Sequence, residues 1–186
     1  MYRNNLSGAE FWTSPHKAIT LLGMSGAGKT TLASRLPQRT WFHYSGDYRI
    51  GTRYLGEAIL DNAKREAMKS PLLAELLRSD SIYLCNNITV SNLKPLSGFL
   101  GMVGDPALGG LGIDEFKRRQ ALHRDAEVCS MLDVREFIDK SLEIYGYPHF
   151  INDAGGSLCE LDEPGVLEQL AEDTLIVYLK PSDEML

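Results

Sequence analysis

The chain has 186 residues, of which 44% are hydrophobic, enough to build one core. Its formal net charge of −6 excludes the electrostatic signature of a general nucleic-acid-binding protein. The three cysteines, Cys85, Cys129 and Cys159, are widely spaced and include no C-x-x-C pair. This pattern argues against a disulfide framework or a zinc site and favours a reducing compartment. No apolar run approaches the length of a membrane span and no signal peptide begins the chain, so we expect a cytoplasmic protein.

Predicted strands and helices alternate after a polar lead-in over residues 1–16. The β-prone runs predict strands at 17–22, 40–44, 81–85, 148–153 and 174–179. Helical patterns cover 30–36, 53–68, 71–78, 114–131, 133–145 and 163–172. Residues 95–112 contain six glycines and two prolines, which predict a loop or mobile connector. Strands that alternate with helices predict an α/β fold with a doubly wound, mainly parallel sheet.

One glycine-rich motif lies between the first predicted strand and the first predicted helix. It reads Gly-Met-Ser-Gly-Ala-Gly-Lys-Thr-Thr and fits the phosphate-binding P-loop pattern G-x-x-x-x-G-K-[ST]. The predicted nucleotide-binding residues are Gly23, Met24, Ser25, Gly26, Ala27, Gly28, Lys29, Thr30 and Thr31. In such a loop Lys29 reaches the β- and γ-phosphates and the Thr30 hydroxyl binds Mg²⁺. The sequence therefore predicts binding of ATP with Mg²⁺.

Two aspartates follow predicted strands at their carboxyl ends, where open α/β sheets bind ligands. Asp47 follows the second strand, and Asp153 ends a later one and is followed by two glycines. A carboxylate there can hold Mg²⁺ or accept a proton from an attacking hydroxyl. The alternatives are structural: Asp47 would cap the next helix and Asp153 would form an Asx turn. We assign Asp153, with Thr30, to the metal and Asp47, with Lys29, to catalysis.

Together with the P-loop, these segments resemble the shikimate-kinase-like branch of small-molecule P-loop kinases. The residues that carry the resemblance are Ser45-Gly46-Asp47, Ile50, Arg53, Gly56, Ile59, Ala154-Gly155-Gly156-Ser157 and the stretch 175–182. The resemblance implies that Asp47 contacts the acceptor substrate and serves as the base. It also implies that Arg53 helps to bind an anionic or polar acceptor, and that Gly155 and Gly156 line the acceptor site. Arg49 is a second candidate, because an anionic acceptor would need one of the two arginines. Both arginines have a simpler interpretation as solvated residues at a helix start.

The chain departs from this family at several points. Ser45 stands where the family has the first aspartate of its Asp-x-Asp motif. Ala154 stands where the family has the first of three consecutive glycines. The stretch from Asp47 to Gly155 is longer than in the compact kinases, which implies a helical insertion at about 60–146 within a domain spanning 17–186. The family's lid helix and last strand would follow Leu186, so we expect this chain to bind nucleotide weakly and to turn over poorly. The motif is also similar to that of adenylylsulfate kinases, and the whole chain resembles uncharacterised bacterial P-loop ATPases.

Two functions remain open from the sequence. The first is a kinase that transfers the γ-phosphoryl group of ATP to a small polar acceptor. The second is an ATPase switch whose nucleotide state orders 95–112 and the helices of 113–146 for a partner protein. A nucleic-acid-modifying kinase would need a basic groove, which the sequence does not show. The sequence defines neither the acceptor nor the oligomeric state.

Overall fold

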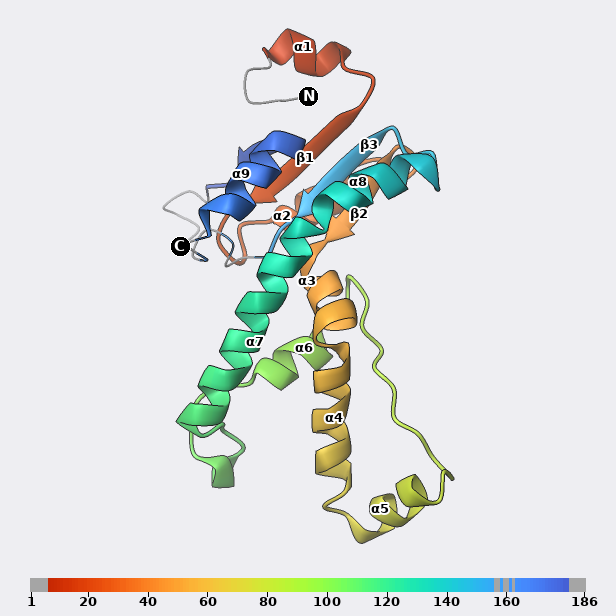
Figure 1. Ribbon diagram of the computed structural model, residues 1–186, viewed down its shortest axis with the longest axis vertical. Helices are drawn as coiled ribbons and strands as arrows, with labels where there is room; N and C mark the ends of the chain where they lie inside the picture. Colours follow the sequence, from red (N-terminus) through yellow and green to blue (C-terminus); the bar gives the residue numbers. More distant parts are fainter. Residues whose placement is uncertain (1–6, 156–157, 159–160, 162, 181–186) are drawn as a thin grey trace. The chain divides into compact units, whose positions relative to one another are not determined.

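The computed structural model describes residues 7–155, 158, 161 and 163–180. The chain forms two compact units: the first comprises residues 1–46 and 127–186, and the second comprises residues 47–126. The first unit holds a sheet of four parallel strands and the second is helical (Figure 1). The predicted α/β class with a parallel sheet is confirmed. Among the described residues, no helix is long and apolar enough to cross a membrane.

The first unit alternates strands with helices along the chain. Its elements are α1 (Gly8–Thr13), β1 (Lys17–Leu22), α2 (Lys29–Arg35), β2 (Trp41–Ser45), the end of α7 (Ile113–Leu132), α8 (Val134–Glu143), β3 (His149–Asp153), α9 (Pro164–Asp173) and β4 (Leu175–Tyr178). The strands lie in the order β2-β3-β1-β4. The connection from β1 to β2 passes β3, whereas the connection from β3 to β4 passes β1 in the opposite direction. Because parallel crossovers are right-handed, these two connections must cover opposite faces of the sheet.

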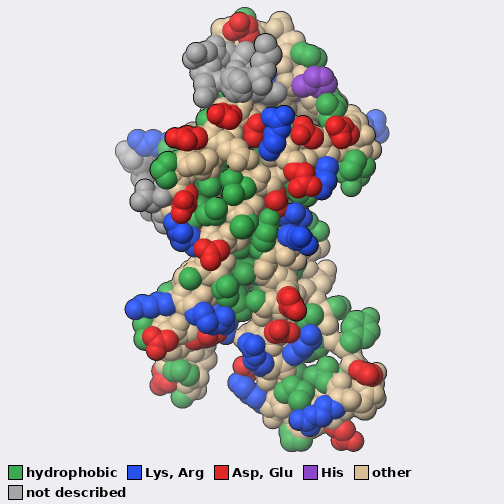
Figure 2. Space-filling view, viewed as in Figure 1, with side chains coloured by type: hydrophobic (Ala, Val, Ile, Leu, Met, Phe, Trp, Pro, Cys, Tyr) green, Lys and Arg blue, Asp and Glu red, His purple; other side chains and the backbone are tan. Residues whose placement is uncertain are grey.

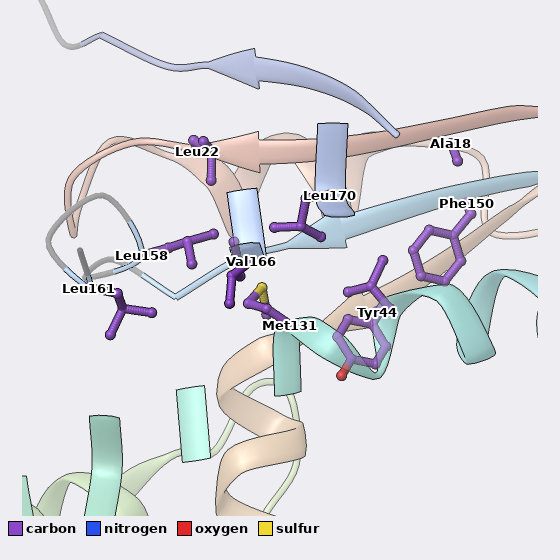
Figure 3. Packing of buried hydrophobic residues seen from close by; sticks show 11 residues of the cluster. Ala18, Leu22, Tyr44, Met131, Phe150, Leu158, Leu161, Val166 and Leu170 are labelled. Atoms are coloured by element: carbon purple, nitrogen blue, oxygen red, sulfur yellow. The ribbon is translucent and has the colours of Figure 1, made fainter. Parts of the chain in front are cut away.

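The packing of apolar side chains confirms that both faces are covered. On one face, Leu21 and Ile151 pack with Ala33 of α2. On the other face, a larger cluster joins the sheet to α8 and α9 (Figure 3). Leu158 and Leu161, which follow β3, are buried in this cluster, so the core anchors the chain just beyond the end of that strand. Burial of one such side chain stabilises a fold by roughly 1.5–3 kcal/mol.

The second unit is built from helices and one long extended segment. Its elements are α3 (Gly46–Arg49), η1 (a π-helix, Ile50–Tyr54), α4 (Gly56–Ala67), α5 (Pro71–Arg78), α6 (Lys94–Leu100), η2 (a 3₁₀ helix, Pro106–Leu108) and the start of α7. Its core is the cluster Ile50, Leu55, Ile59, Ile88, Leu96, Phe99 and Ala126.

Two sequence-based predictions about secondary structure are wrong. Residues 81–85 are extended but pair with no strand among the described residues, so they form no sheet. The predicted loop at 95–112 contains most of α6, because burial of Leu96 and Phe99 outweighs the nearby glycine and proline. The polar lead-in contains α1, which a capping box between Ser7 and Glu10 stabilises at its start.

A buried arginine links three helices of the second unit. The Arg119 guanidinium donates hydrogen bonds to the Phe99 carbonyl oxygen, to Asn62 Oδ1 at 2.8 Å and to Glu115 Oε1 at 2.7 Å. It also lies 4.7 Å from the centroid of the Phe99 ring, a cation–π contact. These bonds join α4, α6 and α7 at one point.

We expect Arg119→Ala to lower the free energy of unfolding of the second unit by about 3 kcal/mol, because it removes the buried guanidinium that donates to the Phe99 carbonyl oxygen and to Asn62. Arg118→Ala is the matched control, since Arg118 also binds Glu115 but is exposed, and should cost less than about 1 kcal/mol. Urea unfolding and hydrogen exchange of the α6 amides measure the difference. Equal losses in both variants would refute the role given to Arg119.

The same arginines make the stability of this unit depend on pH. Hydrogen bonds from Arg118 and then Arg119 lower the pKa of Glu115 from 4.5 to about 2. A carboxyl with a depressed pKa in the folded state adds stability above its unfolded pKa and loses it as the pH falls. We therefore expect Glu115→Gln to destabilise the second unit at pH 7 and to destabilise it less as the pH falls from about 4.5 toward 2, where about half of the folded-state carboxyl is protonated. Chemical unfolding at several pH values tests this, and a difference that does not shrink with pH would contradict it.

Candidate functional site

The loop between β1 and α2 has a backbone that requires glycine. Gly23, Gly26 and Gly28 have φ angles of +148°, +83° and +88°, in the region that L side chains rarely adopt. A Cβ atom at Gly23 would also lie 2.6 Å from the Leu179 carbonyl oxygen. The chain beyond β4 is held there because the Leu179 amide donates to the Leu22 carbonyl oxygen at 2.7 Å. The glycines of the motif therefore serve the loop's own shape.

The lysine of the motif is folded back onto this loop. Lys29 opens α2 directly after Gly28, and only 7% of the residue is exposed. Its Nζ donates to the Gly23 carbonyl oxygen at 2.7 Å and to the Met24 carbonyl oxygen at 3.0 Å. An ammonium has three donors and accepts nothing, and a phosphate oxygen is a stronger acceptor than a carbonyl. The Lys29 ammonium is thus a buried cation beside the loop, and a bound phosphate could replace the two carbonyl oxygens as its acceptor.

Most of the remaining residues of the motif are exposed to solvent. Met24, Ser25, Gly26, Thr30 and Thr31 are exposed, and Ala27 and Gly28 are half-buried. The Ala27 amide donates to the Met24 carbonyl oxygen at 3.1 Å and closes a turn. The Thr30 hydroxyl is therefore accessible from outside the loop.

A buried carboxylate ends the strand next to β1. Asp153 is the last residue of β3, lies opposite Leu21 of β1 in the ladder and is 6% exposed. Since side chains alternate along a strand, Asp153 lies on the same face as Ile151, the face that packs against α2. The connections that follow the neighbouring strands β1 and β3 leave toward opposite faces of the sheet. Open α/β sheets bind their ligands just beyond the carboxyl ends of two such strands. The loop and Asp153 therefore belong to one edge of the sheet.

His43 of β2 is the neighbour of this carboxylate. Its Nε2 lies 3.5 Å from Asp153 Oδ2, a distance within reach of an ion pair. The same Nε2 is buried and forms no hydrogen bond with the residues that the structure describes. Only the register of β2 on β3 brings the two side chains together, and no local signal predicts that register.

The oxygen atoms at this edge suit Mg²⁺. The described residues contain no cluster of three or more His, Cys, Asp or Glu side chains that would form an all-protein metal site. Magnesium prefers oxygen ligands and commonly uses one or two carboxylates together with substrate phosphates. Asp153 and the Thr30 hydroxyl provide that chemistry.

The turns that follow β2 and β3 meet in the first unit. A Cβ atom added to Gly46 would lie 3.4 Å from the Gly155 amide nitrogen and 2.8 Å from Met131 Cε. Gly155 is buried in this contact. Gly156, also predicted to line the acceptor site, lies outside the described residues.

The other predicted acceptor residues belong to the second unit. Asp47 is half-buried in α3, and Arg49 at the end of α3 places its guanidinium 5.7 Å from the Tyr54 ring centroid. Arg53 is exposed in η1. Their roles remain predictions from the sequence.

No protein-family model, no curated protein and no solved structure matches this chain.

Proposed function

We propose that this protein is an ATP-binding kinase of the P-loop type, which transfers the γ-phosphoryl group from Mg-ATP to a small polar acceptor. The observation that carries the proposal is the buried ammonium of Lys29, held by the carbonyl oxygens of a glycine loop between a strand and a helix. Among the described residues Lys29 forms no ion pair, and phosphate binding would supply a reason for the burial of its ammonium.

The carboxylate on the neighbouring strand supports the same proposal. Asp153 lies at the end of β3, and the loop follows β1, the strand paired with it. A phosphate site with a carboxylate beside it is what a metal–nucleotide complex requires. In this proposal the Thr30 hydroxyl and the Asp153 carboxylate hold Mg²⁺, which would neutralise charge on the β- and γ-phosphates.

The residues of the chain then divide the reaction between them. Lys29 and the loop amides bind the phosphates and stabilise the charge that builds up on the departing ADP oxygen. Asp47 orients the acceptor hydroxyl and takes its proton as the new oxygen–phosphorus bond forms. Arg49, Arg53, Gly155 and Gly156 are proposed to bind the acceptor. The assignment of Asp47 rests on its place directly after Ser45 and Gly46 at the carboxyl end of β2.

One feature favours a second function, an ATP-dependent switch. Residues 47–126, between β2 and β3, form a compact unit with a core of their own. An addition of this size is a natural site for a partner protein, and nucleotide-dependent switching of such segments is a known mode of regulation.

Release of ADP separates the two functions. The full chain would be incubated with Mg-ATP, with and without pools of polar metabolites, and ADP would be measured by a coupled assay. Release that depends on one pool supports the kinase and begins to identify its acceptor. Slow release independent of any acceptor, together with firm ATP binding, supports the switch. Absence of ATP binding would refute both.

A further inference from the structure

A long uncharged segment of the second unit runs outside its helices, as the coil between α5 and α6 (Figure 1). Residues 82–90 read Ile-Tyr-Leu-Cys-Asn-Asn-Ile-Thr-Val and contain no charge, proline or glycine. Burial alternates along the first seven of them. Ile82, Leu84, Asn86 and Ile88 are half-buried or buried, whereas Tyr83, Cys85 and Asn87 are exposed. This period of two is that of a strand with one covered face.

The covered face of the segment lies along α4. Ile88 packs in the same cluster as Ile59, and Asn86 Nδ2 donates to the Gly56 carbonyl oxygen at 2.7 Å. Farther along, Ile82 and Leu84 line a groove with Met68, just past the end of α4. The segment therefore runs antiparallel to α4, as Figure 1 shows for the coil between α5 and α6.

Most backbone groups of residues 82–88 have no partner among the described residues; the exceptions are the Asn87 carbonyl oxygen, which accepts from Asn92 Nδ2 at 2.7 Å, and the Ile82 amide, which donates to the Leu76 carbonyl oxygen. Among the residues that the structure describes, the amides of residues 83–88 donate to no backbone carbonyl. Natural proteins protect such edges with charges, prolines or bulges, because unpaired N–H and C=O groups are a template for another strand. None of these devices occurs in residues 82–90.

Apolar side chains are exposed around the same segment. Tyr83 is 84% exposed and Leu72 of α5 is 64% exposed. A groove of about 420 Å³ lies beside Tyr83 and is lined by Lys64, Met68, Leu77, Asp80, Ile82, Tyr83 and Leu84. In Figure 2 hydrophobic side chains reach the surface over α5 and this segment. Strand pairing would cover part of this surface.

We propose that residues 82–88 pair in antiparallel fashion with the same residues of a second copy of the chain. A symmetric antiparallel pair of this segment is centred on its middle residue, so Cys85 lies opposite Cys85 of the second copy and Tyr83 lies opposite Asn87. Such a pair is isologous, because each copy contributes the same residues in the same arrangement.

The composition of the segment favours a second copy over a different protein. The exposed face carries Tyr83, Cys85 and Asn87, so no like charges meet when the segment faces itself. It also carries no charged side chain that would select an unrelated sequence. Six or seven uncharged, β-prone residues without proline are the typical composition of strands that pair with their own copies.

Charge reversal at the central residue tests the proposal. Cys85 is an exposed free cysteine, so substitution there should leave the fold intact. In C85K, and separately in C85E, like charges would lie directly opposite each other, and we expect each variant alone to be monomeric. A mixture of C85K and C85E should form a one-to-one heterodimer. Light scattering after size exclusion, over a concentration series, measures the masses.

Two controls make the test specific. Leu108→Lys adds the same charge at a residue that is 87% exposed elsewhere in the second unit, and it should dimerise like the wild type. A short bis-maleimide should cross-link wild-type dimers through Cys85, whereas C85S should dimerise without that cross-link. Circular dichroism checks that every variant is folded. The proposal would be overturned if the wild type were monomeric or if C85K still formed dimers. It would also be overturned if this edge bound only an extended peptide of unrelated sequence.

Discussion

Replacing Lys29 with alanine is expected to lower the turnover of Mg-ATP by about 10²–10³-fold. The substitution removes the buried ammonium that contacts the carbonyl oxygens of Gly23 and Met24, and with it the cation proposed to bind the β- and γ-phosphates. ATP binding should weaken as well, because the phosphates carry most of the charge that the loop recognises. Calorimetric titration with ATP and the ADP-release assay measure the two effects.

Lys17→Ala is the matched control for this variant. Lys17 begins β1, the strand that Lys29 follows, and its Nζ also donates to a backbone carbonyl oxygen, that of Ser14 at 2.6 Å. It lies at the amino end of the strand, opposite to the loop. We expect normal nucleotide binding in Lys17→Ala, and an equal loss in both variants would mean that Lys29 acts only on folding.

Replacing Asp153 with asparagine is expected to raise the Mg²⁺ concentration needed for half-maximal turnover by about 10–100-fold. The change keeps the shape of the side chain but removes the negative charge that would hold the metal. Binding of ATP without Mg²⁺ should be unchanged or slightly stronger, because a like charge near the phosphates is lost. Measuring the affinity for ATP at several Mg²⁺ concentrations therefore reports on metal binding directly, and it does not require the acceptor to be known.

Asp173→Asn controls for the loss of a buried carboxylate in the same unit. Asp173 ends α9 and forms an ion pair with Arg135 at 2.8 Å, and its side chain is 9% exposed against 6% for Asp153. It should lower stability without changing the response to Mg²⁺. A shift in the Mg²⁺ requirement of the same size in both variants, or in neither, would remove Asp153 from the metal site.

Local signals in the sequence predicted much of the fold. The bounds of β1 and α5 agree with prediction, because an apolar run before the glycine motif and a proline at the first turn of a helix are independent of distant residues. Residues 81–85 have the composition of a strand, but whether such a segment forms a sheet depends on a neighbouring strand. In α6, tertiary burial of Leu96 and Phe99 overrode the turn-forming residues.

The candidate site also contains features that the local sequence predicts and features that it does not. The glycine loop and Lys29 are contiguous in sequence, so their pattern was visible without a structure. The approach of His43 to Asp153 depends on the register of β2 on β3, and the close packing of Gly46 on Gly155 depends on where two distant turns meet. These relations arise only when the sheet is assembled. The division of the chain at Asp47 also follows from tertiary contacts rather than from composition.

The most direct test of the central claim compares the affinities of the chain for ATP, ADP, AMP and adenosine in the presence of Mg²⁺. If the loop holds the β-phosphate through Lys29, ATP and ADP should bind at least tenfold more tightly than AMP and adenosine, a difference of about 1.4 kcal/mol, and Lys29→Ala should abolish the difference. Equal affinity for ATP and adenosine, or no binding of any of them, would contradict the proposed function of this loop.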